Sequence, residues 1–171
     1  PLPCAAGTYS NVTDLTSPAE CTQTPPGFFS SIGSIDSIAC APGAYTDETG
    51  QSECSNCEHG SYQDESGTTA CKPCVRGYYC GAGAPAALPC DAGTFSNATN
   101  LASADQCLTC PEGTFCPVGS AAVTNCSAGT FNDRPMRESC TKCPAGTYQQ
   151  RDGATACNCC TANSYCEEGS V

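Results

Sequence analysis

The stretch Cys143–Cys157 reads CPAGTYQQRDGATAC, and most of the chain is a variation on it. A glycine, Gly146, stands three residues after the first cysteine, and an aromatic residue stands five residues after it. Pro144 presets the φ angle of a turn and Gly146 can adopt left-handed geometry, so we expect a turn followed by a short strand. Asp152-Gly153 is a typical hairpin turn, and Ala154–Ala156 would form the return strand. The stretch therefore predicts one small hairpin closed at its base by its two cysteines.

The same opening, a cysteine with glycine three residues on and an aromatic residue five residues on, recurs throughout the chain. It begins at Cys4, Cys40, Cys57, Cys74, Cys90, Cys110 and Cys126. After Cys160 the glycine position holds Asn163, the non-glycine residue that best tolerates left-handed φ. This exception supports a conformational role for the glycine, and the recurrence predicts a tandem array.

The composition favours covalent staples over a hydrophobic core. The chain has 171 residues and 19 cysteines, no tryptophan, and only 18 residues of leucine, isoleucine, valine and phenylalanine together. So few large apolar groups cannot fold an ordinary globule, and so many cysteines are typical of disulfide-rich proteins of an oxidising compartment. Closing a loop of about 15 residues contributes roughly 3 kcal/mol per bridge. We expect an extracellular or cell-surface location.

A larger period of 86 residues spans the chain. Aligned without gaps at this spacing, 33 of 85 residue pairs are identical, and eight cysteines of one unit coincide with eight of the other. We therefore predict two repeat units, residues 1–86 and 87–171, in an array where each unit touches mainly its neighbours. The expected fold is small and disulfide-rich: an elongated tandem repeat of short β-hairpins and turns with little regular secondary structure. The uncharged connectors 81–89 and 117–125 are interpreted as extended linkers.

Local disulfide pairing is favoured over interlaced schemes by one difference between the two units. Thr24 and Ser30 stand where the second unit has Cys110 and Cys116, so a pair has been lost without leaving an orphan thiol. Nineteen is odd, and Cys159 has no counterpart in the first unit. The local scheme pairs Cys4–Cys21, Cys40–Cys54, Cys57–Cys71, Cys74–Cys80, Cys90–Cys107, Cys110–Cys116, Cys126–Cys140, Cys143–Cys157 and Cys160–Cys166.

Charge argues against several classes of partner. The net charge is −11, whereas nucleic acid and anionic membrane surfaces require clustered basic residues. No apolar run approaches the roughly 18 residues of a membrane span, and Pro1 does not begin a signal peptide. We expect a mature segment of a longer protein, with no nucleic acid partner and no membrane span within the segment.

Zinc is the main alternative to disulfides, and catalysis has weaker support. Two four-cysteine patterns have zinc-ligand spacing, but the same C-x2-C junction at Cys107 and Cys110 has no second junction at that distance. The single histidine, His59, occupies a turn position, and no nucleophilic triad can be assembled around it. We expect no bound metal, no cofactor and no enzyme activity. The acidic pairs Asp64-Glu65 and Glu167-Glu168 are interpreted as solvated loop charges in preference to calcium ligands. The patterns comprise Cys54, Cys57, Cys71 and Cys74, and Cys140, Cys143, Cys157 and Cys160.

Three Asn-x-Ser/Thr sequons are candidate N-glycosylation sites. Asn11 and Asn97 are equivalent across the 86-residue period and lie in the same sequence context, which favours both. Asn125 has a cysteine in the middle position of its sequon and is a poorer candidate. The aromatic residues after the glycines could form a ligand-binding ladder, but packing over their own disulfides is the favoured interpretation.

Repeats of the form CPAGTY, about ten residues and then C-x2-C-x2-G-x-aromatic resemble the ephrin-receptor-like cysteine-rich repeat. They are also similar to cysteine-rich modules of tumour-necrosis-factor receptors and of furin-like and EGF-like growth-factor receptors. The resemblance implies an extracellular disulfide ladder that acts as a spacer or a ligand platform. Similar arrays occur in surface proteins of protists and algae, including flagellar hair (mastigoneme) subunits, where they build filaments.

These observations predict a non-enzymatic extracellular structural protein: a rod-like cysteine-rich segment of a surface protein or filament subunit. Its expected partners are N-linked glycans and other protein chains, through self-assembly or within a longer parent chain. The alternative is the stalk or ligand-binding ectodomain of a cell-surface receptor. Cys159 is expected to pair with a cysteine outside this segment, in the same chain or a neighbouring subunit.

Overall fold

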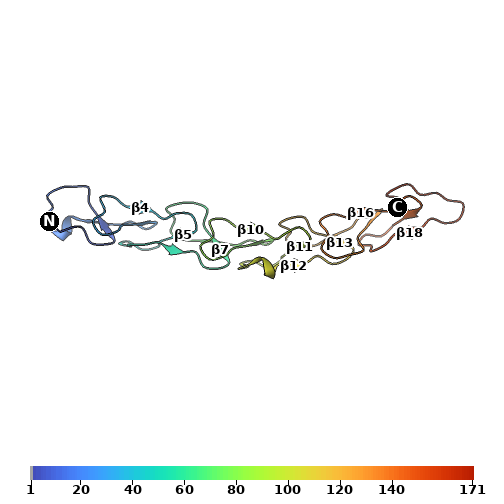
Figure 1. The fold of residues 1–171 in the computed structure, drawn as a ribbon, viewed down its shortest axis with the longest axis horizontal. Helices are drawn as coiled ribbons and strands as arrows, with labels where there is room; N and C mark the ends of the chain where they lie inside the picture. The colour runs from blue at the N-terminus through green and yellow to red at the C-terminus, as the bar shows by residue number, and fades with distance from the viewer. Residues whose placement is uncertain (1) are drawn as a thin grey trace. The chain divides into compact units, whose positions relative to one another are not determined.

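The structure is a computed structural model that describes residues 2–171, and it is built almost entirely from two-residue strands. In this range there are nine two-stranded antiparallel sheets, each of them one hairpin (Figure 1). Two short 3-10 turns, η1 (Pro18–Glu20) and η2 (Ala104–Gln106), lie at equivalent places in the two repeats. The predicted fold class, a small disulfide-rich tandem array of hairpins, is confirmed.

The hairpins follow one another in chain order, and each pairs two consecutive strands. The first four are β1 (Thr8–Tyr9) with β2 (Thr22–Gln23), β3 (Phe28–Phe29) with β4 (Ile38–Ala39), β5 (Ala44–Tyr45) with β6 (Ser55–Asn56), and β7 (Ser61–Tyr62) with β8 (Lys72–Pro73). The other five are β9 (Tyr78–Tyr79) with β10 (Leu88–Pro89), β11 (Thr94–Phe95) with β12 (Leu108–Thr109), β13 (Thr114–Phe115) with β14 (Thr124–Asn125), β15 (Thr130–Phe131) with β16 (Thr141–Lys142), and β17 (Thr147–Tyr148) with β18 (Asn158–Cys159).

The chain divides into two compact units. One comprises the described part of Pro1–Cys74 together with Cys80–Ala87, and the other comprises Val75–Tyr79 and Leu88–Val171. The division falls inside the hairpin that begins at Cys74. The 86-residue repeat units deduced from the alignment remain a prediction of the sequence.

The return strand of each hairpin lies further along the chain than we predicted. Tyr148 is opposite Asn158, and Thr147 is opposite Cys159, so the return strand is not Ala154–Ala156. The cause is a backbone hydrogen bond: the N–H of Cys160 donates to the carbonyl of Gly146 (3.0 Å), which places the two residues before Cys160 beside the first strand. Each C-x2-C junction of this type is therefore a return strand.

The two predicted linkers also belong to hairpins. Residues Leu88–Pro89 form β10 and pair with β9, and residues Thr124–Asn125 form β14 and pair with β13. Their glycine-, alanine- and serine-rich composition gave no strand signal. Pro89 is compatible with a two-stranded sheet because such a sheet has only edge strands, on which a missing N–H is tolerated.

Each of the nine hairpins, and the last segment from Cys160 onward, contains two residues with positive φ, which we call the opening residue and the loop-tip residue. Asn163 occupies an opening position with φ 64°, which confirms the interpretation of that exception. Three loop tips, Asp14, Asn100 and Met136, also carry a side chain. The opening residues are Gly7, Gly27, Gly43, Gly60, Gly77, Gly93, Gly113, Gly129, Gly146 and Asn163, and the loop tips are Asp14, Gly33, Gly50, Gly67, Gly83, Asn100, Gly119, Met136, Gly153 and Gly169.

Successive hairpins are joined by the backbone of the opening residue. Gly113 is representative: its carbonyl accepts from the N–H of Cys126 (2.9 Å), and its own N–H donates to the carbonyl of Asn132 in the next hairpin (2.9 Å). The same two bonds recur at the other eight opening glycines. A joint made by the backbone tolerates variation in the side chains.

A second contact reaches the hairpin after the next. A Cβ added to Gly113 would lie less than 3.0 Å from the carbonyl of Gly153, which is the loop tip two hairpins further on. Gly7, Gly27, Gly43, Gly77, Gly93 and Gly129 meet the loop tip two hairpins on in the same way. At these seven opening positions glycine therefore serves both the conformation and this close approach.

The core consists of disulfides. Among the described residues, the buried hydrophobic side chains are ten cysteines and Leu101. Buried polar residues such as Thr46, Gln63, Asn132 and Gln149 follow the first strand of their hairpins. The molecule thus replaces aliphatic packing with sulfur and backbone hydrogen bonds.

Candidate functional site

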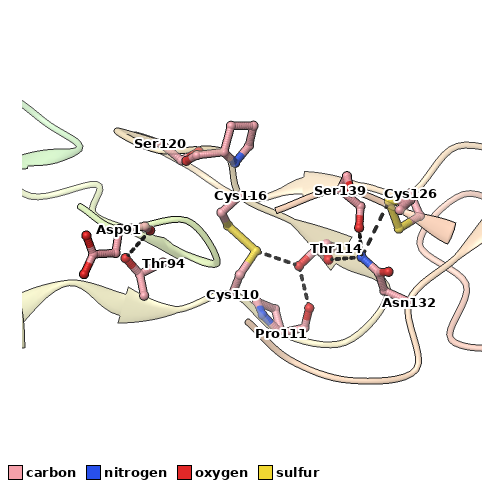
Figure 2. Close-up of a disulfide and its surroundings, with 12 residues drawn as sticks. Asp91, Thr94, Cys110, Pro111, Thr114, Cys116, Ser120, Cys126, Asn132 and Ser139 are labelled. Carbon is pink, nitrogen blue, oxygen red and sulfur yellow. Dashed lines mark hydrogen bonds between the residues drawn. A yellow bond between two sulfur atoms is a disulfide. The ribbon is translucent and has the colours of Figure 1, made fainter. Parts of the chain in front are cut away.

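The hairpin opened by Cys110 shows how one module is held (Figure 2). The Cys110–Cys116 disulfide joins the two sides of β13. The Sγ atom of Cys110 lies 3.2 Å from the hydroxyl of Thr114. Thr114 donates this hydroxyl to the carbonyl of Pro111 (2.7 Å), closing the opening turn. From the next hairpin, the amide of Asn132 donates to the carbonyls of Thr114 (2.9 Å) and Ser139 (3.2 Å). One buried side chain therefore links its own loop to the preceding strand.

Eighteen cysteines form nine disulfides, and the pairs are those of the local scheme. They are Cys4–Cys21, Cys40–Cys54, Cys57–Cys71, Cys74–Cys80, Cys90–Cys107, Cys110–Cys116, Cys126–Cys140, Cys143–Cys157 and Cys160–Cys166. All eight cysteines of the two zinc-like patterns are among them, so each of these sulfurs is bonded to another sulfur. No group of three or more potential metal ligands occurs within residues 2–171.

The hairpin that lacks its staple uses hydrogen bonds in its place. Thr24 and Ser30 are both fully buried at the positions of the missing cysteines. The Thr24 hydroxyl donates to the carbonyl of Gly7 (2.8 Å), and the Thr24 N–H donates to the same carbonyl (3.0 Å). The joint is therefore retained in the absence of the disulfide.

The three sequon asparagines are all accessible. Asn11 and Asn97 are exposed in the loops closed by Cys4–Cys21 and Cys90–Cys107. Asn125 is exposed in β14, where it pairs with Thr114. This exposure permits glycan attachment, and occupancy remains a prediction.

Cys159 is exposed in β18, and it is the one cysteine without a disulfide in the described part of the chain. It faces Thr147 of β17 in the hairpin register. Its position on a return strand leaves the thiol accessible to another chain. A bond from Cys159 to a cysteine outside this segment remains a prediction.

The acidic pairs and His59 all lie at exposed positions. Lys72 contacts Asp64 (2.6 Å) and Glu65 (3.1 Å). The hydrogen bond from Lys72 lowers the pKa of Asp64 and raises the pKa of Lys72. Glu168 lies 3.8 Å from Lys142, and His59 is exposed. These contacts are typical of surface ion pairs, which contribute little to stability.

Most aromatic residues of the first strands are half-buried, in keeping with a packing role. Tyr165, which belongs to no strand, is 85% exposed. The favoured interpretation, a ring packed over each disulfide, remains a prediction. The sequence analysis did not predict the contact between an opening glycine and the loop tip two hairpins further on. Its signal was a second recurring glycine, which is present at most loop tips.

Comparison with known proteins identifies part of the array. Residues 43–79 and 113–155 match the family model described as "Tyrosine-protein kinase ephrin type A/B receptor-like". No curated protein matches the chain. No helix in residues 2–171 is long and apolar enough to cross a membrane. The disulfides and the family match together indicate an extracellular or cell-surface cysteine-rich region.

Proposed function

We propose that this chain, which carries ephrin-receptor-like cysteine-rich repeats at residues 43–79 and 113–155, is a non-enzymatic structural segment of an extracellular surface protein or filament subunit. The observation that carries the proposal is the joint between hairpins. At nine successive positions the same bond joins the opening glycine of a hairpin to the N–H of the residue that starts the next segment of the chain. In such an array each unit contacts mainly its neighbours, so length is set by the number of units.

The surface supports the same role. A net charge of −11 keeps an array with little core soluble, and exposed sequons at Asn11 and Asn97 would add solubilising glycans. The disulfides provide resistance to unfolding in an oxidising compartment. Neither property requires a reaction centre.

Immunogold electron microscopy of non-permeabilised cells tests the proposal. An antibody raised against the folded chain should label extracellular filaments or surface projections, and prior absorption of the antibody with the purified chain should abolish the labelling. Uniform labelling of the plasma membrane without such structures would contradict a filament role. Labelling only after permeabilisation would contradict an extracellular role.

One observation favours the alternative, a ligand-binding receptor ectodomain. Ile32, Ile35 and Ile38 are 70%, 73% and 53% exposed within the hairpin that lacks a disulfide. Their counterparts in the second repeat are Val118 and the smaller or polar Ala121 and Thr124. Exposed apolar side chains that occur together often mark a protein-binding surface.

Replacing the three isoleucines with serine separates the two functions. A receptor ectodomain should lose binding of the fluorescently labelled chain to cells, whereas the matched Val118→Ser variant should bind normally. A structural segment should show no difference between these variants.

A further inference from the structure

The loop of the β15–β16 hairpin differs in chemistry from its counterpart 86 residues earlier. Residues 133–139 read DRPMRES, with two basic and two acidic side chains, whereas residues 47–53 read DETGQSE, with three acidic side chains and none that is basic. The loop-tip glycine, Gly50, is replaced by Met136, the only methionine of the chain. Two of the six basic residues, Arg134 and Arg137, stand close to it. The later loop therefore carries an apolar side chain between two arginines.

Met136 has a backbone conformation that a side chain of its kind does not favour. Its φ is 60°, and the other positive-φ residues in the described part of the chain are glycine, aspartate or asparagine. The array imposes this geometry: the N–H of Met136 donates to the carbonyl of Cys110 (2.9 Å), and the carbonyl of Arg137 accepts from the N–H of Cys116 (2.8 Å). Glycine would satisfy the same bonds without strain, so the methionine is not explained by the joint.

The side chains of this loop are available to a partner. Met136 is 59% exposed, and the side chain of Arg134 is 74% exposed. Arg137 is exposed and forms no salt bridge within residues 2–171. Methionine and arginine are both enriched at protein interfaces. The two backbone bonds hold the loop in place before any partner binds, which lowers the entropic cost of binding. We call residues Arg134–Arg137 the methionine loop.

The first half of the chain carries a hollow of complementary charge. Its volume is about 310 Å³, and its lining includes Tyr45, Asp47, Glu58, Ser61 and Thr69. Neither carboxylate forms a salt bridge in the part of the chain that the structure describes, and no lysine or arginine precedes Lys72. At the 86-residue period Glu58 corresponds to Pro144, so this pair of carboxylates has no counterpart in the second repeat. We call the hollow lined by these five residues the acidic hollow.

We propose that the methionine loop of one copy binds the acidic hollow of a second copy. The guanidinium of Arg137 pairs with the carboxylates of Asp47 and Glu58, and the thioether of Met136 packs against the ring of Tyr45. The occupant is a second copy because each surface departs from its own counterpart in the sense that complements the other. Charge complementarity of this kind selects the partner and fixes the register of the contact.

The interface is heterologous, since the two surfaces differ, and every copy carries both of them. Such contacts form open chains of copies unless the rotation closes a ring. The inference therefore deepens the proposed filament role, on which it rests.

Replacing Met136 with glycine separates a binding role from a structural one. Sedimentation of the 171-residue chain should show association that rises with concentration. Met136→Gly should raise the dissociation constant about tenfold or more, because an apolar side chain buried in the contact is lost. The same variant should unfold at a higher temperature, because glycine adopts left-handed geometry without strain. Unchanged association in this variant would overturn the inference.

Charge variants test the ionic half of the contact. Arg137→Glu and Asp47→Lys should each remain monomeric where the unmodified chain associates, and the double variant should regain association. Arg151→Glu and Asp91→Lys are matched controls, because they make the same charge changes at exposed positions outside both surfaces. Both controls should associate like the unmodified chain. Equal losses in Arg137→Glu and Arg151→Glu would show an effect of net charge alone and would contradict the proposed contact.

Photo-crosslinking identifies the two surfaces. A benzophenone side chain at position 69, on the exposed edge of the hollow, should crosslink to Arg134–Arg137 of a nitrogen-15-labelled chain mixed with it. Crosslinks confined to one chain would overturn the inference, as would a chain that stays monomeric at its solubility limit. These outcomes leave the immunogold result unaffected, so failure of the contact is distinguishable from failure of the structural role.

Discussion

Replacing Gly113 with alanine should destabilise the array more than the same replacement at Gly146. Both residues have left-handed backbone geometry, with φ of +72° and +85°. A Cβ at Gly113 would lie less than 3.0 Å from the carbonyl of Gly153, whereas a Cβ at Gly146 meets nothing within 4 Å. The pair therefore separates the cost of conformation from the cost of the contact between alternate hairpins.

The magnitude follows from the contacts. Left-handed geometry costs a residue with a Cβ about 1–2 kcal/mol, and both variants incur this cost. At Gly113 the backbones must also separate, which weakens the bonds from Gly113 N to Asn132 O (2.9 Å) and from Gly153 N to Cys126 O (2.7 Å). Each such bond contributes about 0.5–1.5 kcal/mol net. We therefore expect Gly113→Ala to cost about 1–3 kcal/mol more than Gly146→Ala.

Native-state hydrogen exchange with the disulfides intact measures this difference locally. The reporter is the Gly153 amide, which belongs to the same hairpin as Gly146. Its exchange should be about 5- to 150-fold faster in Gly113→Ala than in Gly146→Ala, since every 1.4 kcal/mol is a factor of ten. Equal exchange in the two variants would refute the contact between alternate hairpins.

Three further predictions concern the staples and the surface. Replacing both Thr24 and Ser30 with cysteine should form the missing disulfide and stabilise the fold by about 2 kcal/mol, less about 1 kcal/mol for the lost Thr24 hydrogen bond. A mass 2 Da below that of the reduced form, together with a raised unfolding temperature, would establish the disulfide, whereas two free thiols would contradict it. Native material should carry N-glycans on Asn11 and Asn97, and recovery of both peptides fully unmodified would contradict this. Alkylation of unreduced native material should leave Cys159 unlabelled because its sulfur is bonded to another chain segment, whereas quantitative labelling would show a free thiol.

The opening turns could be predicted from the sequence because a single residue determines each one. Gly146 and Asn163 both occur where left-handed geometry is required, and the structure gives both positive φ. Thr24 and Ser30 stand where the second repeat has two cysteines. The joint absence of these cysteines from the first repeat indicated that they are partners. In these cases the physical cause lies within a few residues of the signal.

The return strands could not be placed in the same way. A two-residue strand such as Asn158–Cys159 has no alternation of polar and apolar residues to reveal it. Its position depends on the hydrogen bond from the N–H of Cys160 to the carbonyl of Gly146. These two residues are too far apart in the sequence to belong to one turn. The contact between Gly113 and Gly153 spans an even longer separation and involves no side chain. Backbone-to-backbone contacts of this kind leave little trace in residue type.

Small-angle scattering of the isolated chain tests most directly the elongated tandem array that the sequence predicts. For a compact globule of 171 residues the radius of gyration would be about 15.5 Å. The account predicts a radius of gyration well above that value, and a value close to it would contradict the account.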